Sequence, residues 1–91
     1  MTARTIWKKV LRPMDVQSIL IPAGSEFLCA REQLDMICVW FICDPTAPEE
    51  PREIAIVGTG NPAPAPDARY LGTAALRGGQ LILHVFEEMT P

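Results

Sequence analysis

The residues of this chain that could do nucleophilic or acid–base chemistry are few and stand apart from one another. His84 is the single histidine, flanked by apolar residues, and no partner for proton transfer lies near it in the sequence. We therefore expect a structural histidine that is hydrogen-bonded to Thr73 or to the backbone. Catalysis by a cysteine is also disfavoured, because Cys38 and Cys43 lie in the most apolar run, where burial raises the pKa of a thiol.

The spacing of the cysteines does not suit a metal site. Cys29, Cys38 and Cys43 are nine and five residues apart, whereas structural zinc sites use CxxC pairs. An odd number of cysteines indicates free thiols in a reducing compartment. The acidic residues, Glu87 among them, fall mainly in turns or at strand ends, so we interpret them as solubility charges. The sequence thus predicts a protein that is not an enzyme and carries neither metal nor cofactor.

One glycine-containing stretch resembles a ligand-binding loop at first sight. Gly58-Thr59-Gly60-Asn61-Pro62 lacks the lysine and the following helix that a phosphate loop needs. Glycine at the end of a strand more often marks a bulge or a turn. The alternating prolines that follow, up to residue 67, favour an extended course, and a loop of this length could still form the lip of a binding site.

The run 36–43 is the stretch around which the rest of the chain is organised. It contains eight consecutive apolar residues, including β-branched and aromatic ones, and ends at Asp44-Pro45. This composition suits a β-strand, and the run is too short for a membrane span. We predict that it is the central strand of the sheet and is buried on both faces, which requires a layer on each side.

Strands and turns alternate along the whole chain, and no stretch has a helical period. Residues 44–52 form a polar, proline-containing loop. We predict one all-β domain over residues 1–91, a small antiparallel β-sandwich or barrel of about seven strands built from hairpins. The expected strands are 5–11, 16–21, 25–32, 36–43, 53–57, 69–76 and 80–87.

Two hairpins can be predicted in register. A loop at Gln33-Leu34 or at Leu34-Asp35 joins the third and fourth strands, and in both registers Phe27 and Cys29 share a face with Trp40. In the last hairpin, Gly78-Gly79 is a two-residue loop of the kind that type I′ and II′ turns prefer. This loop sets Thr73 opposite His84 and Leu71 opposite Phe86.

Charge and the N-terminus limit the partners and the location. The net charge of −3 and the pI near 5.0 argue against a nucleic-acid partner. The first residues lack the apolar region of an export signal, so we expect a cytoplasmic protein with no membrane association. A chain of this size leaves much of its surface wet, which is compatible with a homo-oligomer.

Several short motifs follow one another in an order that resembles a known family. They are Thr5-Ile6-Trp7-Lys8, Pro22-x-Gly24, Cys38-Val39-Trp40, Asp44-Pro45, Gly58-Thr59-Gly60-Asn61-Pro62, Tyr70-Leu71-Gly72-Thr73, Gly78-Gly79 and His84-Val85-Phe86-Glu87. The pattern resembles a family of small tailed-phage and prophage proteins of unknown function. This chain departs from it by Leu34-Asp35, where those proteins tend to carry Asn-Gly, and by a longer loop at 62–66. The resemblance implies a phage context and no particular activity.

Three functions follow as hypotheses. The first is a non-enzymatic phage or prophage accessory protein that binds a host or phage protein through a β-edge or through the 58–68 loop, with Trp7 as a contact residue if it is exposed on an edge strand. The second is a module that sequesters a nucleotide-type small molecule in a pocket of a dimer. That pocket would use the amides of Gly58, Thr59, Gly60 and Asn61, together with Arg69 and His84. The third is a minor structural component of the virion.

Overall fold

The computed structural model describes residues 3–89, and this part of the chain is built almost entirely of strands. The all-β prediction is confirmed. Seven strands and one short 3₁₀ turn follow one another as β1 (Thr5–Val10), β2 (Val16–Pro22), β3 (Glu26–Gln33), β4 (Met36–Cys43), β5 (Glu49–Gly58), β6 (Arg69–Leu76), η1 (Arg77–Gly79) and β7 (Leu81–Glu88).

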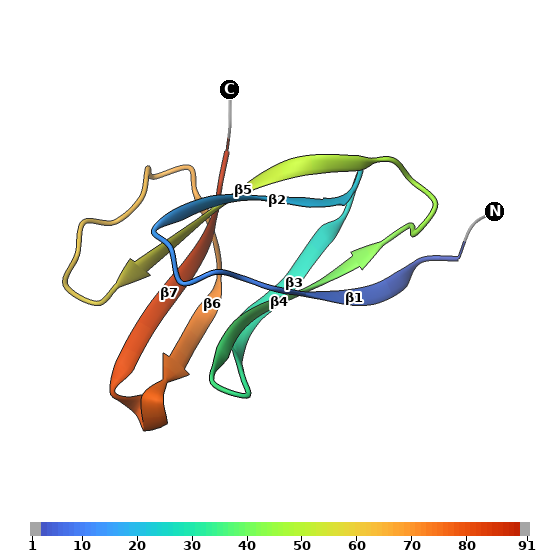
Figure 1. Ribbon diagram of the computed structural model, residues 1–91. Coiled ribbons are helices and arrows are strands. Elements are labelled where there is room, and N and C mark those ends of the chain that lie inside the picture. The colour runs from blue at the N-terminus through green and yellow to red at the C-terminus, as the bar shows by residue number, and fades with distance from the viewer. Residues whose placement is uncertain (1–2, 90–91) are drawn as a thin grey trace.

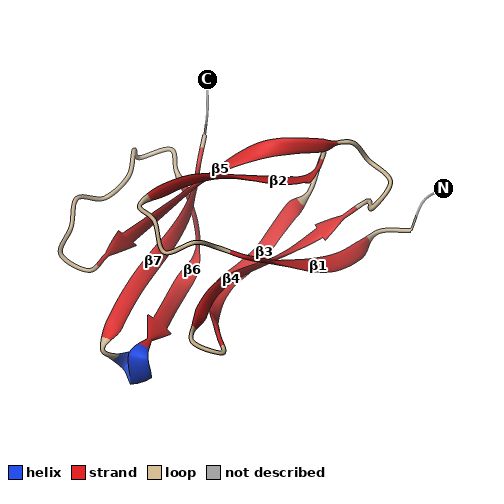
Figure 2. Ribbon diagram, in the orientation of Figure 1, coloured by secondary structure: helices blue, strands red, loops and turns tan. Residues whose placement is uncertain are grey.

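The strands form one sheet in the order β1-β4-β3-β6-β7-β5-β2, with β1 and β2 at its two edges. Five of the six neighbouring pairs are antiparallel, and β3 and β6 are parallel. The sheet curls into a half-barrel, so that β5 and β2 at one end lie over β1, β4 and β3 at the other (Figures 1 and 2). The prediction that 36–43 is the central strand is wrong, because β1 pairs on its outer side and β6 occupies the middle of the sheet.

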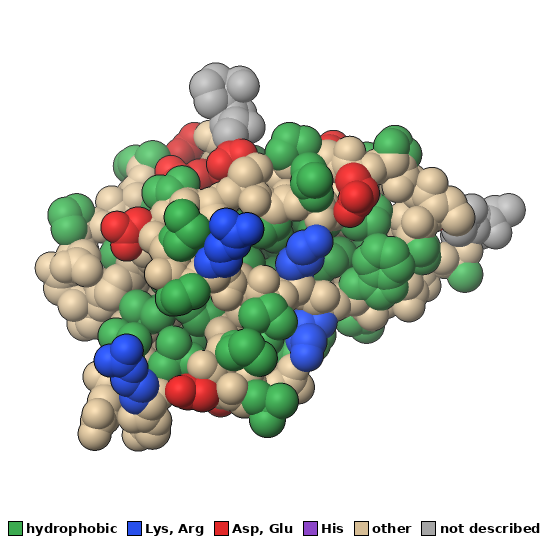
Figure 3. Space-filling view, in the orientation of Figure 1, with side chains coloured by type: hydrophobic (Ala, Val, Ile, Leu, Met, Phe, Trp, Pro, Cys, Tyr) green, Lys and Arg blue, Asp and Glu red, His purple; other side chains and the backbone are tan. Residues whose placement is uncertain are grey.

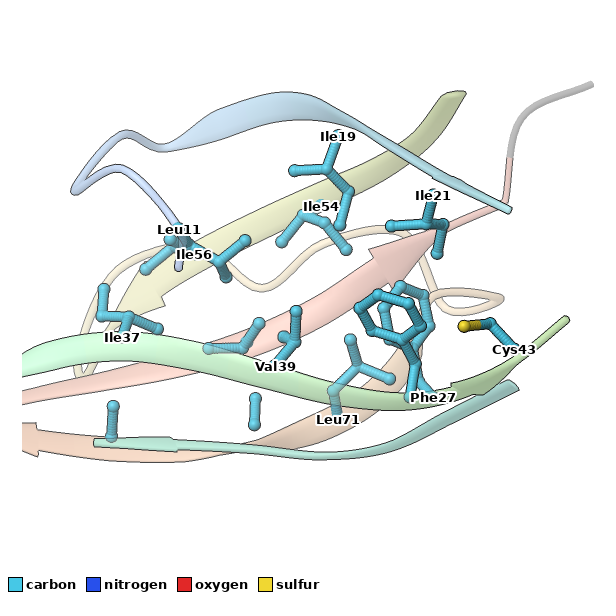
Figure 4. Packing of buried hydrophobic residues seen from close by; sticks show 14 of the residues in the cluster. Leu11, Ile19, Ile21, Phe27, Ile37, Val39, Cys43, Ile54, Ile56 and Leu71 are labelled. Atoms are coloured by element: carbon cyan, nitrogen blue, oxygen red, sulfur yellow. The ribbon is translucent and has the colours of Figure 1, made fainter. Parts of the chain in front are cut away.

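The core fills the concave side of the curled sheet. Ile37, Val39, Phe41 and Cys43 alternate along β4 and are all buried there. They face isoleucines from the opposite end of the sheet, as the close view shows (Figure 4): Ile19 and Ile21 of β2, Ile54 and Ile56 of β5. One curled sheet therefore encloses the core that two packed layers would enclose in a sandwich.

The convex side of β4 is only partly covered. Cys38 is buried, Trp40 and Ile42 are half-buried, and Met36 is exposed. The prediction of burial on both faces thus holds for the concave side and for Cys38, but no second layer packs over the convex side among the described residues.

The β3–β4 hairpin has the second of the two predicted registers. Gln33 pairs with Met36 across the loop Leu34-Asp35, and Cys29 pairs with Trp40. A bulge between Phe27 and Cys29 then shifts the pairing by one residue, which moves every side chain beyond it to the other face. Phe27 therefore packs against Phe41 in the core, with ring centroids 6.1 Å apart, and the prediction that it shares a face with Trp40 is wrong.

Strand β5 begins four residues earlier than predicted, inside the expected polar loop. Its Pro51 lies opposite Leu20 of β2, and pairing with β7 starts only at Glu53. Lys9 Nζ donates a hydrogen bond to the Leu20 carbonyl, which therefore points away from β5. Pro51 occupies a position that needs no backbone N–H, so the proline is compatible with the strand.

The β6–β7 hairpin has the predicted register from Leu76, opposite Leu81, to Gly72, opposite Val85. A bulge between Tyr70 and Gly72 then places Tyr70 opposite Phe86. The prediction that Leu71 lies opposite Phe86 is wrong, and Leu71 is instead buried in the core.

Candidate functional site

A chain of polar side chains crosses the convex face of β6 and β7. Thr73 and His84 lie directly opposite each other in the two strands, and Thr73 Oγ1 is 3.0 Å from His84 Nδ1. The predicted Thr73–His84 hydrogen bond is confirmed. Tyr70 Oη is 2.5 Å from Thr73 Oγ1, and Thr59 Oγ1 is 2.8 Å from His84 Nε2. Both ring nitrogens of the histidine are thus occupied by hydroxyl groups.

The contact between Thr59 and His84 fixes the start of the long loop 58–68 on this face. A turn follows at once, in which the Asn61 amide donates to the Gly58 carbonyl at 3.1 Å, and a second turn joins Ala68 to Ala65 at 2.9 Å. Between these turns the loop projects from the end of β5 as a wide arc (Figure 1). It leaves two adjoining hollows between itself and the convex face of the sheet.

The smaller hollow has a volume of about 210 Å³ and brings five of the seven predicted site residues together. They are Gly58, Thr59, Gly60, Asn61 and His84; Val57, Ala63, Pro64 and Phe86 complete the lining. The volume lies below the range of about 300–1,000 Å³ that is usual for ligand pockets. No lysine or arginine lines it, so the hollow has no permanently charged cation to neutralise a phosphate.

The larger hollow, of about 390 Å³, lies on the other side of Val57, Asn61 and Pro64, which both hollows share. Its remaining lining is mostly apolar, but it includes the carboxylates of Asp15 and Glu88 and no cationic side chain. This lining suits an uncharged or cationic group better than an anion.

The other two predicted residues lie elsewhere. Arg69 pairs with Glu87, and its Nη2 donates to the carbonyl of Phe27 at 3.5 Å. Without the bulge at Leu71, Arg69 would have shared the convex face with Thr73 and His84, and the shift by one residue turns it to the concave side. The structure therefore does not bring Arg69 to the loop 58–68.

Trp7 lies in the edge strand β1 opposite Phe41 and is 42% exposed. It sits on the concave side, at the open margin of the half-barrel. On the convex side of the same strand, Ile6 is 59% and Val10 is 45% exposed. The space-filling view of the side that carries β1 and β2 shows broad apolar areas with lysine and arginine side chains between them (Figure 3).

A cluster that the sequence interpretation missed lies at the end of the core, around Arg52. The Arg52 Nε donates to Glu87 Oε2, its Nη2 lies 3.1 Å from Glu87 Oε1, and its Nη1 donates to the Ser25 carbonyl at 2.9 Å. The guanidinium also stacks 4.9 Å above the ring of Phe27. The hydrogen bond to Glu87 raises the pKa of Arg52 above its usual range, although burial acts in the opposite direction.

Glu87 is buried, so its interpretation as a solubility charge is wrong. The alternation of Glu50, Arg52, Ile54 and Ile56 along one face could have revealed that a charge enters the core. Every N–H of Arg52 named above already has a partner within the protein, so the cluster holds the fold together. Arg52, Arg69 and Glu87 also line a further hollow of about 360 Å³ at this end of the molecule.

Neither a metal cluster nor a membrane-spanning helix is found in the part of the chain that the structure describes. No group of three or more His, Cys, Asp or Glu residues within 3–89 is arranged to hold a metal ion. Within the same residues, no helix has both the length and the apolar character needed to cross a bilayer.

Comparison with known proteins places the chain in a family. Residues 2–91 match a domain of unknown function, DUF7352. No curated protein and no solved structure matches the chain. Since the match covers all but the first residue, the protein belongs to the DUF7352 family.

Proposed function

We propose that this protein is a non-enzymatic accessory protein of a tailed phage or prophage that binds a host or phage protein in the host cytoplasm. The observation that carries the proposal is the unpaired edge strand β1, whose exposed apolar side chains stand on both faces of the sheet. Ile6 and Val10 project on one face and Trp7 on the other. The phage context rests on the resemblance of the ordered motifs described above.

Exposed apolar side chains on both faces are unusual for a strand whose outer side is unpaired. Exposed edges are commonly protected by charges, prolines or a covering segment, because their free backbone groups otherwise pair with other chains. Strand β1 carries Lys8 and Lys9 but also a tryptophan, a residue type enriched at the centres of protein interfaces. A partner protein would bury these apolar side chains and pair the backbone.

Affinity capture from a host lysate tests the proposal with three baits: the wild-type chain, the variant Trp7→Ser and the variant His84→Ala. We expect a partner that the wild type and His84→Ala retain and that Trp7→Ser loses by at least about tenfold, the loss typical of an interface hot spot. Circular dichroism of each bait checks that it is folded. A chain that captures nothing in low or moderate salt, or a Trp7→Ser bait that captures the same protein equally, would contradict the proposal.

The hollows beneath loop 58–68 support a second candidate, a module that sequesters a small molecule. The apolar lining of both hollows, and the carboxylates of Asp15 and Glu88 in the larger one, do not suit nucleotide-type ligands. Uncharged or cationic compounds suit this lining better. A thermal-shift panel containing nucleotides, neutral aromatic compounds and amines separates these classes, since a ligand that binds the native state raises Tm. Mass spectrometry of purified particles tests the third candidate, a minor component of the virion.

A further inference from the structure

One hydrogen bond just after β1 shows which of its backbone groups face β4 and which face away. The Leu11 amide donates to the Ile37 carbonyl at 2.8 Å, which continues the register in which Val10 pairs with Cys38. In an antiparallel pair, alternate residues direct both their N–H and C=O towards the partner strand and the others direct both away. The N–H and C=O groups of Ile6, Lys8 and Val10 therefore lie in the plane of the sheet and point away from β4, towards its open edge.

The same strand carries an excess of positive charge in an acidic protein. The first fourteen residues contain Arg4, Lys8, Lys9 and Arg12 and no acidic residue, so the remaining four basic and eleven acidic residues give the rest of the chain a charge of −7. An edge with this charge attracts acidic segments and repels basic ones.

Both lysine side chains have only neutral partners in the described structure. Lys8 Nζ donates to Gln33 Oε1 at 2.6 Å, and Lys9 Nζ donates to the Leu20 carbonyl at 3.0 Å. The ion pairs found among residues 3–89 involve Arg4 and Arg52 instead. Neither ammonium group has a carboxylate partner: Lys8 Nζ reaches over the sheet to β3, and Lys9 Nζ reaches across the concave side to β2.

The alternation of the strand defines what could pair with it. Lys8 projects on the convex face between Ile6 and Val10, and Lys9 projects on the concave face next to Trp7. A strand added along β1 would pass the two lysines at two successive residues, one on each face, with apolar side chains on either side. Carboxylates on that strand would draw the two ammonium groups from their neutral partners Gln33 and Leu20 towards the edge.

We propose that the edge of β1 binds an extended segment of a partner protein in which two consecutive acidic residues are flanked by β-branched or apolar residues. The segment adds a strand to the sheet: backbone hydrogen bonds to Ile6, Lys8 and Val10 supply affinity, and the acidic pair supplies specificity. This inference rests on the proposed function, since it specifies the partner surface that a binding protein of this kind would recognise.

The probe is a pair of capped hexapeptides, Thr-Val-Glu-Glu-Val-Thr and its neutral counterpart Thr-Val-Gln-Gln-Val-Thr, titrated into the ¹⁵N-labelled full chain at low salt. We expect the acidic peptide to bind at least about tenfold more tightly than the neutral one, a preference that shrinks as salt screens the charges. The amide shifts should cluster in β1 and β4. Equal binding of the two peptides, no binding at millimolar concentration, or shifts centred on loop 58–68 would overturn the inference.

Two sets of variants separate the contribution of the lysine charges to peptide binding from that of the backbone hydrogen bonds. In K8E/K9E the preference should reverse, so that Thr-Val-Lys-Lys-Val-Thr binds and the acidic peptide does not; a variant that stays folded and binds neither peptide contradicts the charge assignment. Ile6→Pro and Ile6→Ala both shorten the side chain, but only proline removes an outward N–H. We expect Ile6→Pro to bind the acidic peptide roughly fivefold more weakly than Ile6→Ala.

The capture experiment distinguishes failure of this inference from failure of the proposed function. If the wild-type chain captures a partner and K8E/K9E captures it equally, the acidic-strand inference is wrong while the protein remains a binding protein. If K8E/K9E loses the partner and the acidic peptide competes for it, both are supported.

Discussion

Leu34 and Asp35 both adopt a left-handed backbone conformation, with φ values of 53° and 59°. Two successive residues of this kind form the loop of a tight hairpin, where Asn-Gly is the preferred pair. The two residues differ in what they gain. Asp35 Oδ1 accepts a hydrogen bond from the Arg77 amide at 2.7 Å, whereas Leu34 is 82% exposed. Strain at Leu34 is therefore uncompensated by packing.

Leu34→Asn should stabilise the protein by about 1 kcal/mol, because asparagine tolerates the left-handed region far better than a bulky apolar residue. Asp35→Gly should gain less, because it relieves strain but removes the hydrogen bond to Arg77. Urea unfolding of the two variants and the wild type measures the difference. An unchanged midpoint for Leu34→Asn would contradict this account of the turn.

The ion pair of Arg52 and Glu87 is the residue-scale feature on which the end of the core depends. Glu87→Gln should destabilise the protein by about 3 kcal/mol, because it leaves a largely buried guanidinium with only the more exposed carboxylate of Glu50, 3.8 Å away, as a counter-charge. Arg4→Ala is the matched control: it breaks the ion pair with Glu26, whose side chains are both more than half exposed, and should change stability by no more than about 0.5 kcal/mol. Equal effects of the two substitutions on chemical denaturation would show that the burial of the pair is irrelevant.

The three cysteines should differ in reactivity. Burial, and then the charge of Asp44, raise the pKa of Cys43 above its ordinary value of 9.0. Cys38 is buried as well, while Cys29 is half-buried. At pH 8 we expect iodoacetamide to modify Cys29 first and the other two only after unfolding, as peptide mass mapping would show.

The raised pKa also gives a sign for the effect of pH on stability. The neutral thiol of Cys43 is the form that the fold favours, so its contribution to stability is complete below the ordinary pKa and is lost as pH rises through the higher, folded value. Rapid modification of Cys43 in the native protein would contradict both expectations.

At the scale of elements, the junction of β3 and β6 holds the two halves of the sheet together. Among the strands within residues 3–89 it is the one parallel pairing, and it is centred on Ala30 and Gly72. A Cβ atom at Gly72 would lie 2.0 Å from the Ala30 carbonyl oxygen, which is backbone and cannot move aside. The close approach of the two strands therefore requires glycine at this position.

Gly72→Ala should cost at least about 3 kcal/mol, since the added methyl group must push β6 away from β3. Gly58→Ala is the matched control. Its Cβ would meet the Asn61 side-chain nitrogen at 3.2 Å and the flexible Leu83 side chain at 3.9 Å, so its cost should stay below about 1 kcal/mol. Thermal unfolding of the two variants compares them directly, and a Gly72→Ala variant as stable as the wild type would refute the close approach.

Strands with a clear apolar pattern could be predicted from the sequence almost residue by residue. The run 36–43 has the predicted bounds, and the two hairpin registers are set by turn residues and by the two-residue period of the strands. The bulges near Phe27 and Leu71 could not be predicted, because one extra residue leaves no mark on composition. Yet they decide which face carries Phe27 and Arg69, and so which residues meet at the candidate site.

The extent of β5 and the order of the strands in the sheet could not be predicted from the sequence either. Proline normally argues against a paired strand, and Pro51 is tolerated only because its neighbours leave that position without a hydrogen-bonding requirement. Strand order depends on contacts between distant segments, such as β3 with β6, for which a single sequence has no local signal.

At the scale of the whole molecule, the half-barrel has a well-paired middle and two unpaired edges. Stability in such a sheet is uneven, and edge amides are the first to exchange with solvent. Along β1 the protection of the amides should alternate from residue to residue. The amides of Trp7, Lys9 and Leu11 donate towards β4, whereas those of Ile6, Lys8 and Val10 point away from it.

Native-state hydrogen exchange should therefore show an odd–even pattern along β1, with the amides of Trp7, Lys9 and Leu11 protected at least about tenfold more than those of Ile6, Lys8 and Val10. Amides in the middle of the sheet, in β6 and β7, should exchange more slowly than either group. NMR-detected exchange resolves single residues. Uniform protection along β1 would show that something else covers its outer side.

The attachment of β1 has a consequence for how copies of the chain could meet at high concentration. This strand pairs with β4 alone, and a single link, residues 11–15, leads from it to the rest of the described fold. If this pairing and the side-chain contacts of Arg4, Lys8 and Lys9 open, the strand can detach while the other six strands stay joined. Two molecules that exchange their β1 strands would form a domain-swapped dimer with the same core. The length of the 11–15 link governs how readily they do so.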